Sequence, residues 1–140
     1  MQTIISTSEQ ETIAIGKTMA GKAKPPFVLC LYGDLGSGKT VFCKGFAAGL
    51  GIPAKSIKSP TYTLMRKYPL KKNHLYHFDF YRINEADDLL AHDLEEIFAQ
   101  KNAYIVIEWP ERVEKLLPPK RINLELKYQD PTTRVITNRP

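Results

Sequence analysis

The feature that most constrains the fold is an apolar run, Phe27–Tyr32, followed directly by a glycine-rich segment, residues 33–40. The run (FVLCLY) shows no alternation of apolar and polar residues. It therefore predicts a strand buried on both faces, as in a parallel sheet that is covered by helices. A helix is predicted next, over residues 41–50. Strand, glycine-rich loop and helix in this order favour an α/β domain.

The rest of the chain continues this alternation of helices and strands. Small hydroxyl residues at 6–8, followed by acids, predict the start of a helix that Gly21 closes. Tyr104–Ile107 predicts a second fully buried strand. The other predicted elements are a short strand at 62–68, an alternating strand at 75–81, an acidic helix from Asn84 with an apolar stripe of Leu89, Leu90, Leu94, Ile97 and Phe98, and an antiparallel hairpin at 121–128 and 133–137.

Length and composition are those of one globular domain spanning residues 1–140, with 43% apolar and 25% charged residues. Cys30 and Cys43 lie in apolar stretches, which predicts reduced core thiols in a cytoplasmic protein. No apolar run approaches the length of a membrane span, and the first ten residues do not resemble a signal peptide. Residues 12–72 hold eleven basic residues and one acid. This excess of positive charge in one part of the chain fits a phosphate-bearing ligand or nucleic acid, and it fits a solvated basic surface as well.

Residues 33–40 (GDLGSGKT) match the phosphate-loop pattern G-x-x-x-x-G-K-S/T in full, between a buried strand and a helix. In such a loop backbone N–H groups and the N-terminus of the helix bind phosphate oxygens. Lys39 is expected to bridge the β- and γ-phosphates of a nucleotide, and the Thr40 hydroxyl to bind Mg²⁺. The predicted nucleotide-binding residues here are Asp34, Leu35, Gly36, Ser37, Gly38, Lys39, Thr40 and Val41.

Two acidic residues end other predicted strands. Glu108 follows Tyr104–Ile107 and is predicted to be a second Mg²⁺ ligand, the alternative being an ordinary strand-end carboxylate. Asp79 is predicted either to orient water at the metal or accept a proton, or only to pair with Arg82 or Lys39. The three histidines form no recognisable metal set and are predicted to be structural or surface residues.

A loop and an aromatic residue complete the predicted site. Thr61, in the segment Ser59–Thr63, is predicted to sense the γ-phosphate and metal, although Ser-Pro-Thr is also a common turn. Trp109 either walls the site or only ends the strand. A stretch of Lys and Arg at 55–72 is predicted to meet either a phosphate backbone or a partner protein.

Four motifs together resemble the TsaE (YjeE) family of small bacterial P-loop ATPases: residues 33–40, Lys58–Leu64, Tyr76–Arg82 and Ile107–Glu111. The resemblance implies a P-loop NTPase-like domain, with a mostly parallel central sheet, flanking helices and antiparallel C-terminal strands. It also implies an ATPase that acts with the TsaD and TsaB proteins in forming N6-threonylcarbamoyladenosine (t6A) at position 37 of tRNA.

The resemblance further implies roles for single residues. Lys39 would be the phosphate lysine, Thr40 and Glu108 the Mg²⁺ ligands, Thr61 a switch-like threonine and Asp79 a catalytic or metal-positioning acid. Trp109 would lie beside the site, with Arg134 and the start of the first helix near the nucleotide. ATP and Mg²⁺ are the expected cofactors. We expect a monomer that contacts tRNA weakly or indirectly and hydrolyses ATP slowly until TsaD–TsaB bind.

Other functions also fit a phosphate loop. A small-molecule kinase uses one, but it usually needs a lid with arginines, and no clustered lid segment is present. A GTP switch needs an N/T-K-x-D segment to read guanine, and the chain has none. A binding module with a structural nucleotide is the third alternative.

Overall fold

The computed structural model describes residues 2–140 and has an α/β architecture built on one seven-stranded sheet. The strand order is β1-β7-β6-β2-β5-β4-β3. The strands are β1 (Thr3–Ser6), β2 (Phe27–Tyr32), β3 (Met65–Pro69), β4 (His74–Asp79), β5 (Ala103–Glu108), β6 (Ile122–Tyr128) and β7 (Arg134–Arg139). The helices are α1 (Glu9–Lys22), α2 (Lys39–Gly49) and α3 (Asp88–Phe98), with short 3₁₀ segments η1 (Ala54–Ser56) and η2 (Pro110–Leu116).

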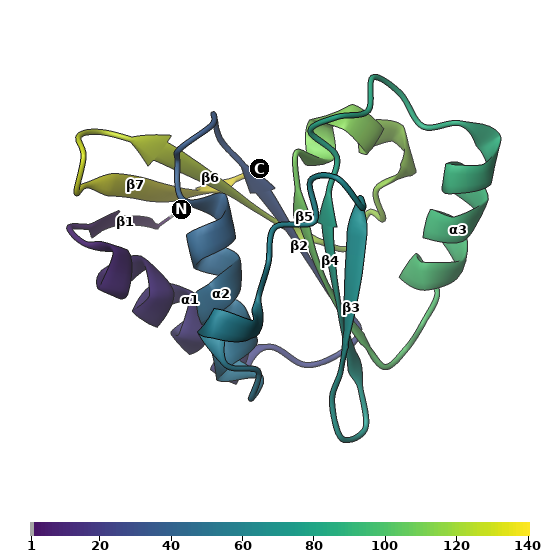
Figure 1. Cartoon of the computed structure of the whole chain (residues 1–140), viewed down its shortest axis with the longest axis horizontal. Coiled ribbons are helices and arrows are strands. Elements are labelled where there is room, and N and C mark those ends of the chain that lie inside the picture. Colours follow the sequence, from purple (N-terminus) through teal and green to yellow (C-terminus); the bar gives the residue numbers. More distant parts are fainter. Residues whose placement is uncertain (1) are drawn as a thin grey trace.

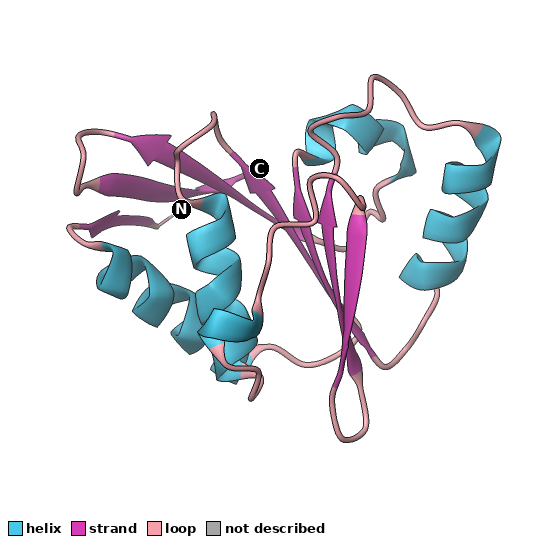
Figure 2. Ribbon diagram, viewed as in Figure 1, coloured by secondary structure: helices cyan, strands magenta, loops and turns pink. Residues whose placement is uncertain are grey.

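The centre of the sheet is parallel and its margins are antiparallel. Strands β6, β2, β5 and β4 pair in parallel, whereas β3 is antiparallel at one edge and β7 and β1 are antiparallel at the other. Figure 1 shows α1 and α2 on one side of the sheet and α3 on the other, and Figure 2 shows the same layers by element type. This arrangement confirms the predicted fold class.

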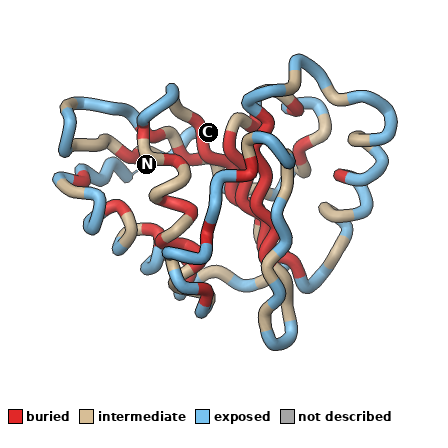
Figure 3. Tube along the Cα trace, viewed as in Figure 1, coloured by how far each residue is buried: buried red, intermediate tan, exposed pale blue. Residues whose placement is uncertain are grey.

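The core consists of two apolar clusters, one on each face of the sheet. Side chains alternate along a strand, so β2 sends Leu29 and Leu31 toward α2 and sends Val28 and Cys30 toward the other face. The first cluster includes Phe42 and Phe46 of α2, and both are fully buried. Figure 3 shows the buried chain concentrated in the central strands. Both cysteines are buried and free, as predicted.

Helices α1 and α2 pack unusually closely, through glycines. A Cβ added at Gly45 of α2 would lie 2.8 Å from the Cα and the carbonyl carbon of Ile13 in α1, and closer still to the Ile13 carbonyl oxygen. A Cβ at Gly16 of α1 would lie 2.6 Å from the Phe42 carbonyl oxygen. Backbone therefore meets backbone at this crossing, which fixes α2 and the loop that precedes it.

Several details of the predicted elements were wrong. Strand β1 was not predicted, because its four residues are stabilised by pairing with β7 and not by a pattern of their own. β3 begins at Met65 because residues 61–63 form a turn. Leu89 does not lie on the packed face of α3: it is 70% exposed, in the first turn after the N-cap Asp87. Within residues 2–140, none of the helices has the length and apolarity needed to cross a membrane.

Candidate functional site

A cavity of about 420 Å³ opens at the C-terminal ends of the parallel strands β2, β4 and β5, where α/β sheets commonly bind ligands. The loop before α2 forms one wall of this cavity, and the strand ends and two other segments form the rest. Its lining residues are Asp34, Leu35, Gly36, Ser37, Gly38, Lys39, Thr40, Val41, Ser59, Thr61, Asp79, Tyr81, Glu108, Trp109 and Arg134. Every predicted site residue therefore lines one cavity.

The loop 33–38 has the backbone conformation of an anion-binding turn. Gly38 has φ +99° and is the N-cap of α2, and Gly36 has φ +80°. An L side chain rarely adopts these φ angles, which explains glycine at both positions. Because Gly38 takes this conformation, α2 begins at Lys39, two residues before its predicted start. The free N–H groups at the start of α2 line the cavity, as a phosphate site requires.

Lys39 is 5% exposed, and backbone oxygens hold its ammonium group. Nζ donates to the carbonyl oxygens of Gly33 and Asp34, the latter at 3.4 Å, and lies 3.9 Å from the centre of the Trp109 ring. Burial lowers the pKa of Lys39, and the nearby carboxylates, Glu108 first, act in the opposite direction. Among the described residues no carboxylate lies within ion-pair distance of Nζ. An anionic ligand would provide the missing negative charge.

Glu108 is 3% exposed and accepts hydrogen bonds from two neighbouring elements. The Thr40 hydroxyl of α2 donates to Oε1 at 2.9 Å and reaches Oε2 at 3.1 Å. His77 of β4 lies with Nε2 2.6 Å from Oε2. The carboxylate therefore links the start of α2 to the centre of the sheet. The two residues predicted to bind Mg²⁺ are directly hydrogen-bonded to each other.

His77 is the main contact that the sequence did not reveal. It was predicted to be structural or at the surface, and it is fully buried between the sheet and α2. Burial alone would lower the pKa of His77, but Cys43 and Glu108 beside the ring raise it well above its ordinary value. The alternation of β4 was the available signal, because it places His77 on the same face as Asp79.

Asp79 ends β4 directly opposite Glu108 on β5. Its carboxylate accepts from the Thr61 hydroxyl at 2.8 Å and from the backbone N–H of Tyr81 at 2.9 Å. Neither Arg82 nor Lys39 is its partner within residues 2–140, and the Arg82 guanidinium lies 4.0 Å from the centre of the exposed Tyr62 ring. Asp79 therefore ties the loop containing Thr61 to the edge of the cavity.

Trp109 walls the cavity. It follows Glu108 in the left-handed conformation, with φ +58°, which is uncommon for a bulky residue and turns the chain sharply out of β5. Its ring lies against Tyr81, with the ring centres 4.9 Å apart. The left-handed turn and the tilted contact with Tyr81 accompany a placement of the indole ring in which the Lys39 ammonium lies over it.

Arg134, the first residue of β7, also lines the cavity. It also lines an adjoining hollow of about 80 Å³ with Ser8, Glu9, Thr12, Gly38, Val41, Pro131 and Thr132. Its guanidinium Nη1 donates to the carbonyl oxygens of Asp130, at 2.8 Å, and Thr133, at 3.1 Å. The start of α1 and the β6–β7 turn thus lie beside Gly38 and Val41.

The donor atoms of the cavity suit Mg²⁺, which prefers oxygen ligands and keeps water and phosphate oxygens in its shell. Thr40 offers a hydroxyl and Glu108 a carboxylate, side by side at the phosphate loop. Among residues 2–140 no three His, Cys, Asp or Glu side chains form a cluster that could hold a metal by themselves.

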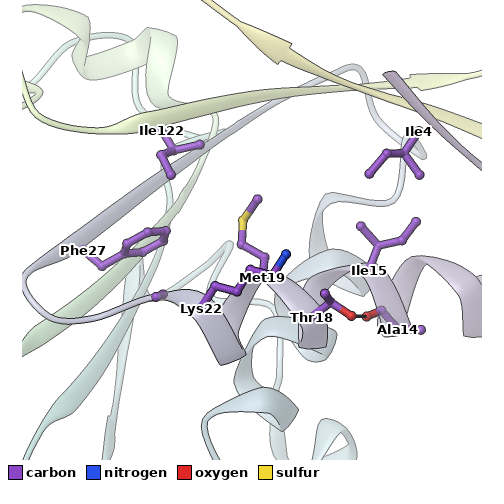
Figure 4. A pocket seen from close by; sticks show the side chains of 9 residues that line it. Ile4, Ala14, Ile15, Thr18, Met19, Lys22, Phe27 and Ile122 are labelled. Atoms are coloured by element: carbon purple, nitrogen blue, oxygen red, sulfur yellow. Dashed lines mark hydrogen bonds between the residues drawn. The ribbon is translucent and has the colours of Figure 1, made fainter. Parts of the chain in front are cut away.

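A second hollow, of about 490 Å³, lies between α1 and the strands β1, β2 and β6. Figure 4 shows its mostly apolar lining. The lining residues are Ile4, Ala14, Ile15, Thr18, Met19, Lys22, Ala23, Phe27 and Ile122. One lysine and no aligned N–H groups of a phosphate loop make it a poor nucleotide site.

Comparison with known proteins agrees with this site and fold. The sequence model of the family described as threonylcarbamoyl adenosine biosynthesis protein TsaE matches residues 6–136. The tRNA threonylcarbamoyladenosine biosynthesis protein TsaE of Bacillus subtilis (strain 168) is 42% identical over 133 residues, which cover 94% of this chain and 81% of that protein. The protein of the same name from Treponema pallidum (strain Nichols) is 37% identical, covering 95% and 96%.

The structural comparison points the same way. A crystal structure of YdiB from Bacillus subtilis superposes with a TM-score of 0.78 and 36% sequence identity, covering 98% of this chain and 83% of that one. Sequence and fold thus match the same group of proteins over nearly the whole chain, phosphate loop included. The chain belongs to the TsaE family of threonylcarbamoyladenosine biosynthesis proteins.

Proposed function

We propose that this protein is the ATP-binding and ATP-hydrolysing component of the t6A machinery in the cytoplasm, and that it supports turnover of a TsaD–TsaB complex. The names of its relatives support a role in forming threonylcarbamoyladenosine on tRNA. The proposed ATPase activity is supported most directly by the hydrogen bond of 2.9 Å between Thr40 and Glu108, beside a complete phosphate loop.

In this proposal the loop amides and the start of α2 bind the phosphates, and Lys39 leaves its carbonyl partners to neutralise the β- and γ-phosphate oxygens. Thr40 and Glu108 hold Mg²⁺, which when bound neutralises charge on the phosphates. Asp79 orients the attacking water from the strand end beside Glu108. Thr61, bonded to Asp79, reports whether the γ-phosphate is present.

We also propose that hydrolysis is slow in the isolated protein and faster in the complex. Arg134 is the arginine that lines the cavity among the described residues, and carbonyl oxygens already hold its guanidinium. Charge that develops on the γ-phosphate therefore lacks a free cationic group besides Lys39. In related hydrolases a group supplied by a partner raises the rate by about 10³-fold or more.

The test is steady-state phosphate release from ATP and from GTP, with Mg²⁺ or EDTA, by the protein alone and with TsaD–TsaB. We expect slow release from ATP with Mg²⁺ that rises when the partners are added. Glu108→Gln removes the carboxylate charge and keeps the volume. It should weaken ATP binding with Mg²⁺ more than binding with EDTA, and equal losses would argue against a metal ligand.

Two further outcomes bear on the proposal. Thr61→Ala should reduce stimulation by the partners more than it reduces ATP affinity, because the substitution removes the bond to Asp79 and leaves the phosphate loop intact. If the isolated protein already hydrolyses ATP as fast as the mixture with TsaD–TsaB, the proposed stimulation by the partners is wrong. Transfer of phosphate to a small acceptor would then favour the kinase alternative.

A further inference from the structure

The buried histidine of β4 makes one short contact that the proposed hydrolysis does not use. We propose that His77 is a positioning residue for Glu108: its ring N–H holds the carboxylate where it meets the metal ion of the bound nucleotide. The inference rests on the proposed function, because it gives His77 a role only if Glu108 binds Mg²⁺. The contact itself, Nε2 to Oε2 at 2.6 Å, does not depend on that function.

The chemistry of the pair fixes which group donates. An ionised carboxylate only accepts hydrogen bonds, so the proton between the two groups belongs to Nε2 of His77. A separation of 2.6 Å is at the short end for a hydrogen bond to a charged group. The other ring nitrogen, Nδ1, has no hydrogen-bond partner among the described residues. The polar contact of the ring is therefore directed at Glu108.

The surroundings of His77 keep its ring in place. The side chain has no exposed surface and lies between the sheet and α2, with Cys43 beside it. It cannot reach a nucleotide or water in the cavity, so it acts through Glu108 and not on the substrate. A ring held on all sides by packing is a rigid hydrogen-bond donor. Loss of a side chain that hydrogen-bonds a metal ligand in this way typically lowers metal affinity or activity by about 10- to 100-fold.

Binding of a metal would make this contact more important. Glu108 has two hydrogen-bonding side chains around it among the described residues, Thr40 and His77. Thr40 is itself a proposed metal ligand, and its hydroxyl has a single proton, which it can donate to only one Glu108 oxygen at a time. His77 is therefore needed to hold Oε2, so that Glu108 does not rotate out of the site.

The experiment compares three variants of the full chain by calorimetric titration of ATP with Mg²⁺ and with EDTA. His77→Leu removes the donor and keeps an apolar filling. His77→Gln keeps an N–H donor near the position of Nε2. His74→Leu is the matched control, because His74 lies on the same strand but at its other end, next to Tyr76. The Mg²⁺ concentration for half-maximal hydrolysis is measured as well.

We expect His77→Leu to weaken ATP binding by about 10-fold or more with Mg²⁺ and by less than about 2-fold with EDTA, and to raise the Mg²⁺ requirement. His77→Gln should recover most of both losses, and His74→Leu should match the wild type. If His77→Leu does not fold, His77→Asn replaces it, since the shorter side chain stops before Glu108.

Two results would overturn the positioning role. One is a His77 variant whose Mg²⁺ dependence equals that of the wild type. The other is an equal loss with Mg²⁺ and EDTA that glutamine does not recover, which is the behaviour of a residue that only fills the core. A wild-type protein that binds ATP without any Mg²⁺ dependence would instead refute the proposed function.

Discussion

Replacing Gly45 with alanine tests how much the close crossing of α1 and α2 contributes to the stability of the fold. The added Cβ would lie 2.8 Å from the Cα and carbonyl carbon of Ile13, whereas carbon atoms in proteins normally approach to about 3.5–4.0 Å. Both contacting atoms are backbone, so no side-chain rotation relieves the overlap. The helices must therefore separate by roughly 1 Å, which is the shortfall in this contact.

The cost follows from two opposing effects. Overpacking a rigid contact costs about 1–3 kcal/mol, and a backbone-to-backbone overlap belongs at the upper end. Alanine recovers about 1 kcal/mol through its better helix propensity. We expect Gly45→Ala to lower the free energy of unfolding by about 2 kcal/mol, and Tm by about 6 °C for a chain of this size.

The matched control is Gly21→Ala, in the last turn of α1. A Cβ there would meet nothing within 4 Å. Helix propensity then acts alone, and we expect a gain of about 0.5 kcal/mol. Urea unfolding followed by circular dichroism at 222 nm gives both values. Gly45→Ala as stable as Gly21→Ala, with the same dependence on urea, would refute the argument from close packing.

Three further predictions concern the site and the core. Lys39→Ala should abolish hydrolysis and weaken ATP binding by about 10-fold or more while Tm stays within about 3 °C, and wild-type turnover by the variant would contradict the role of Lys39. ATP with Mg²⁺ should raise the fluorescence emission of Trp109, the only tryptophan of the chain. The Lys39 ammonium lies 3.9 Å from the centre of its ring, where it quenches the emission, and it moves to the phosphates when ATP binds. Lys39→Ala should show no such change. In the native protein both cysteines should resist iodoacetamide at pH 8, because both are buried. Burial also raises the pKa of Cys30 to about 12, so only about 10⁻⁴ of that thiol is ionised at this pH. Labelling as fast as in urea would contradict their burial.

The parts of the fold that local chemistry determines were predictable from the sequence. The unbroken apolar run at Phe27–Tyr32 indicated a strand buried on both faces, and the glycine pattern indicated the loop and helix that follow. Strand β1 and the position of β3 were not predictable in this way. Their residues are held by pairing with β7 and β4, which are distant in sequence or separated by a turn.

The same distinction applies to the site. Asp79 and Glu108 could be predicted because each ends a strand, and Lys39 and Thr40 because they complete the phosphate-loop pattern. Which of them touch one another could not be predicted, since a hydrogen bond such as Thr40–Glu108 joins residues 68 positions apart. The role of His77 could not be predicted for a related reason: the alternation of β4 gives the face on which this histidine lies, but not that Glu108 of the adjacent strand β5 is its partner.

The two carboxylates of the cavity, Glu108 and Asp79, are held by different parts of the molecule. Glu108 is bonded to α2 and the sheet core, both rigid elements, so its position changes little when surface loops move. Asp79 lies opposite Glu108 on β4, but its side-chain partner is Thr61. Thr61 belongs to a surface loop, in which the next residue, Tyr62, is 81% exposed. A contact that moves this loop therefore reaches Asp79 and leaves Glu108 in place. In the proposed mechanism, metal binding at Glu108 and water positioning at Asp79 would therefore respond separately to a bound protein, and the Thr61–Asp79 hydrogen bond would carry the second response.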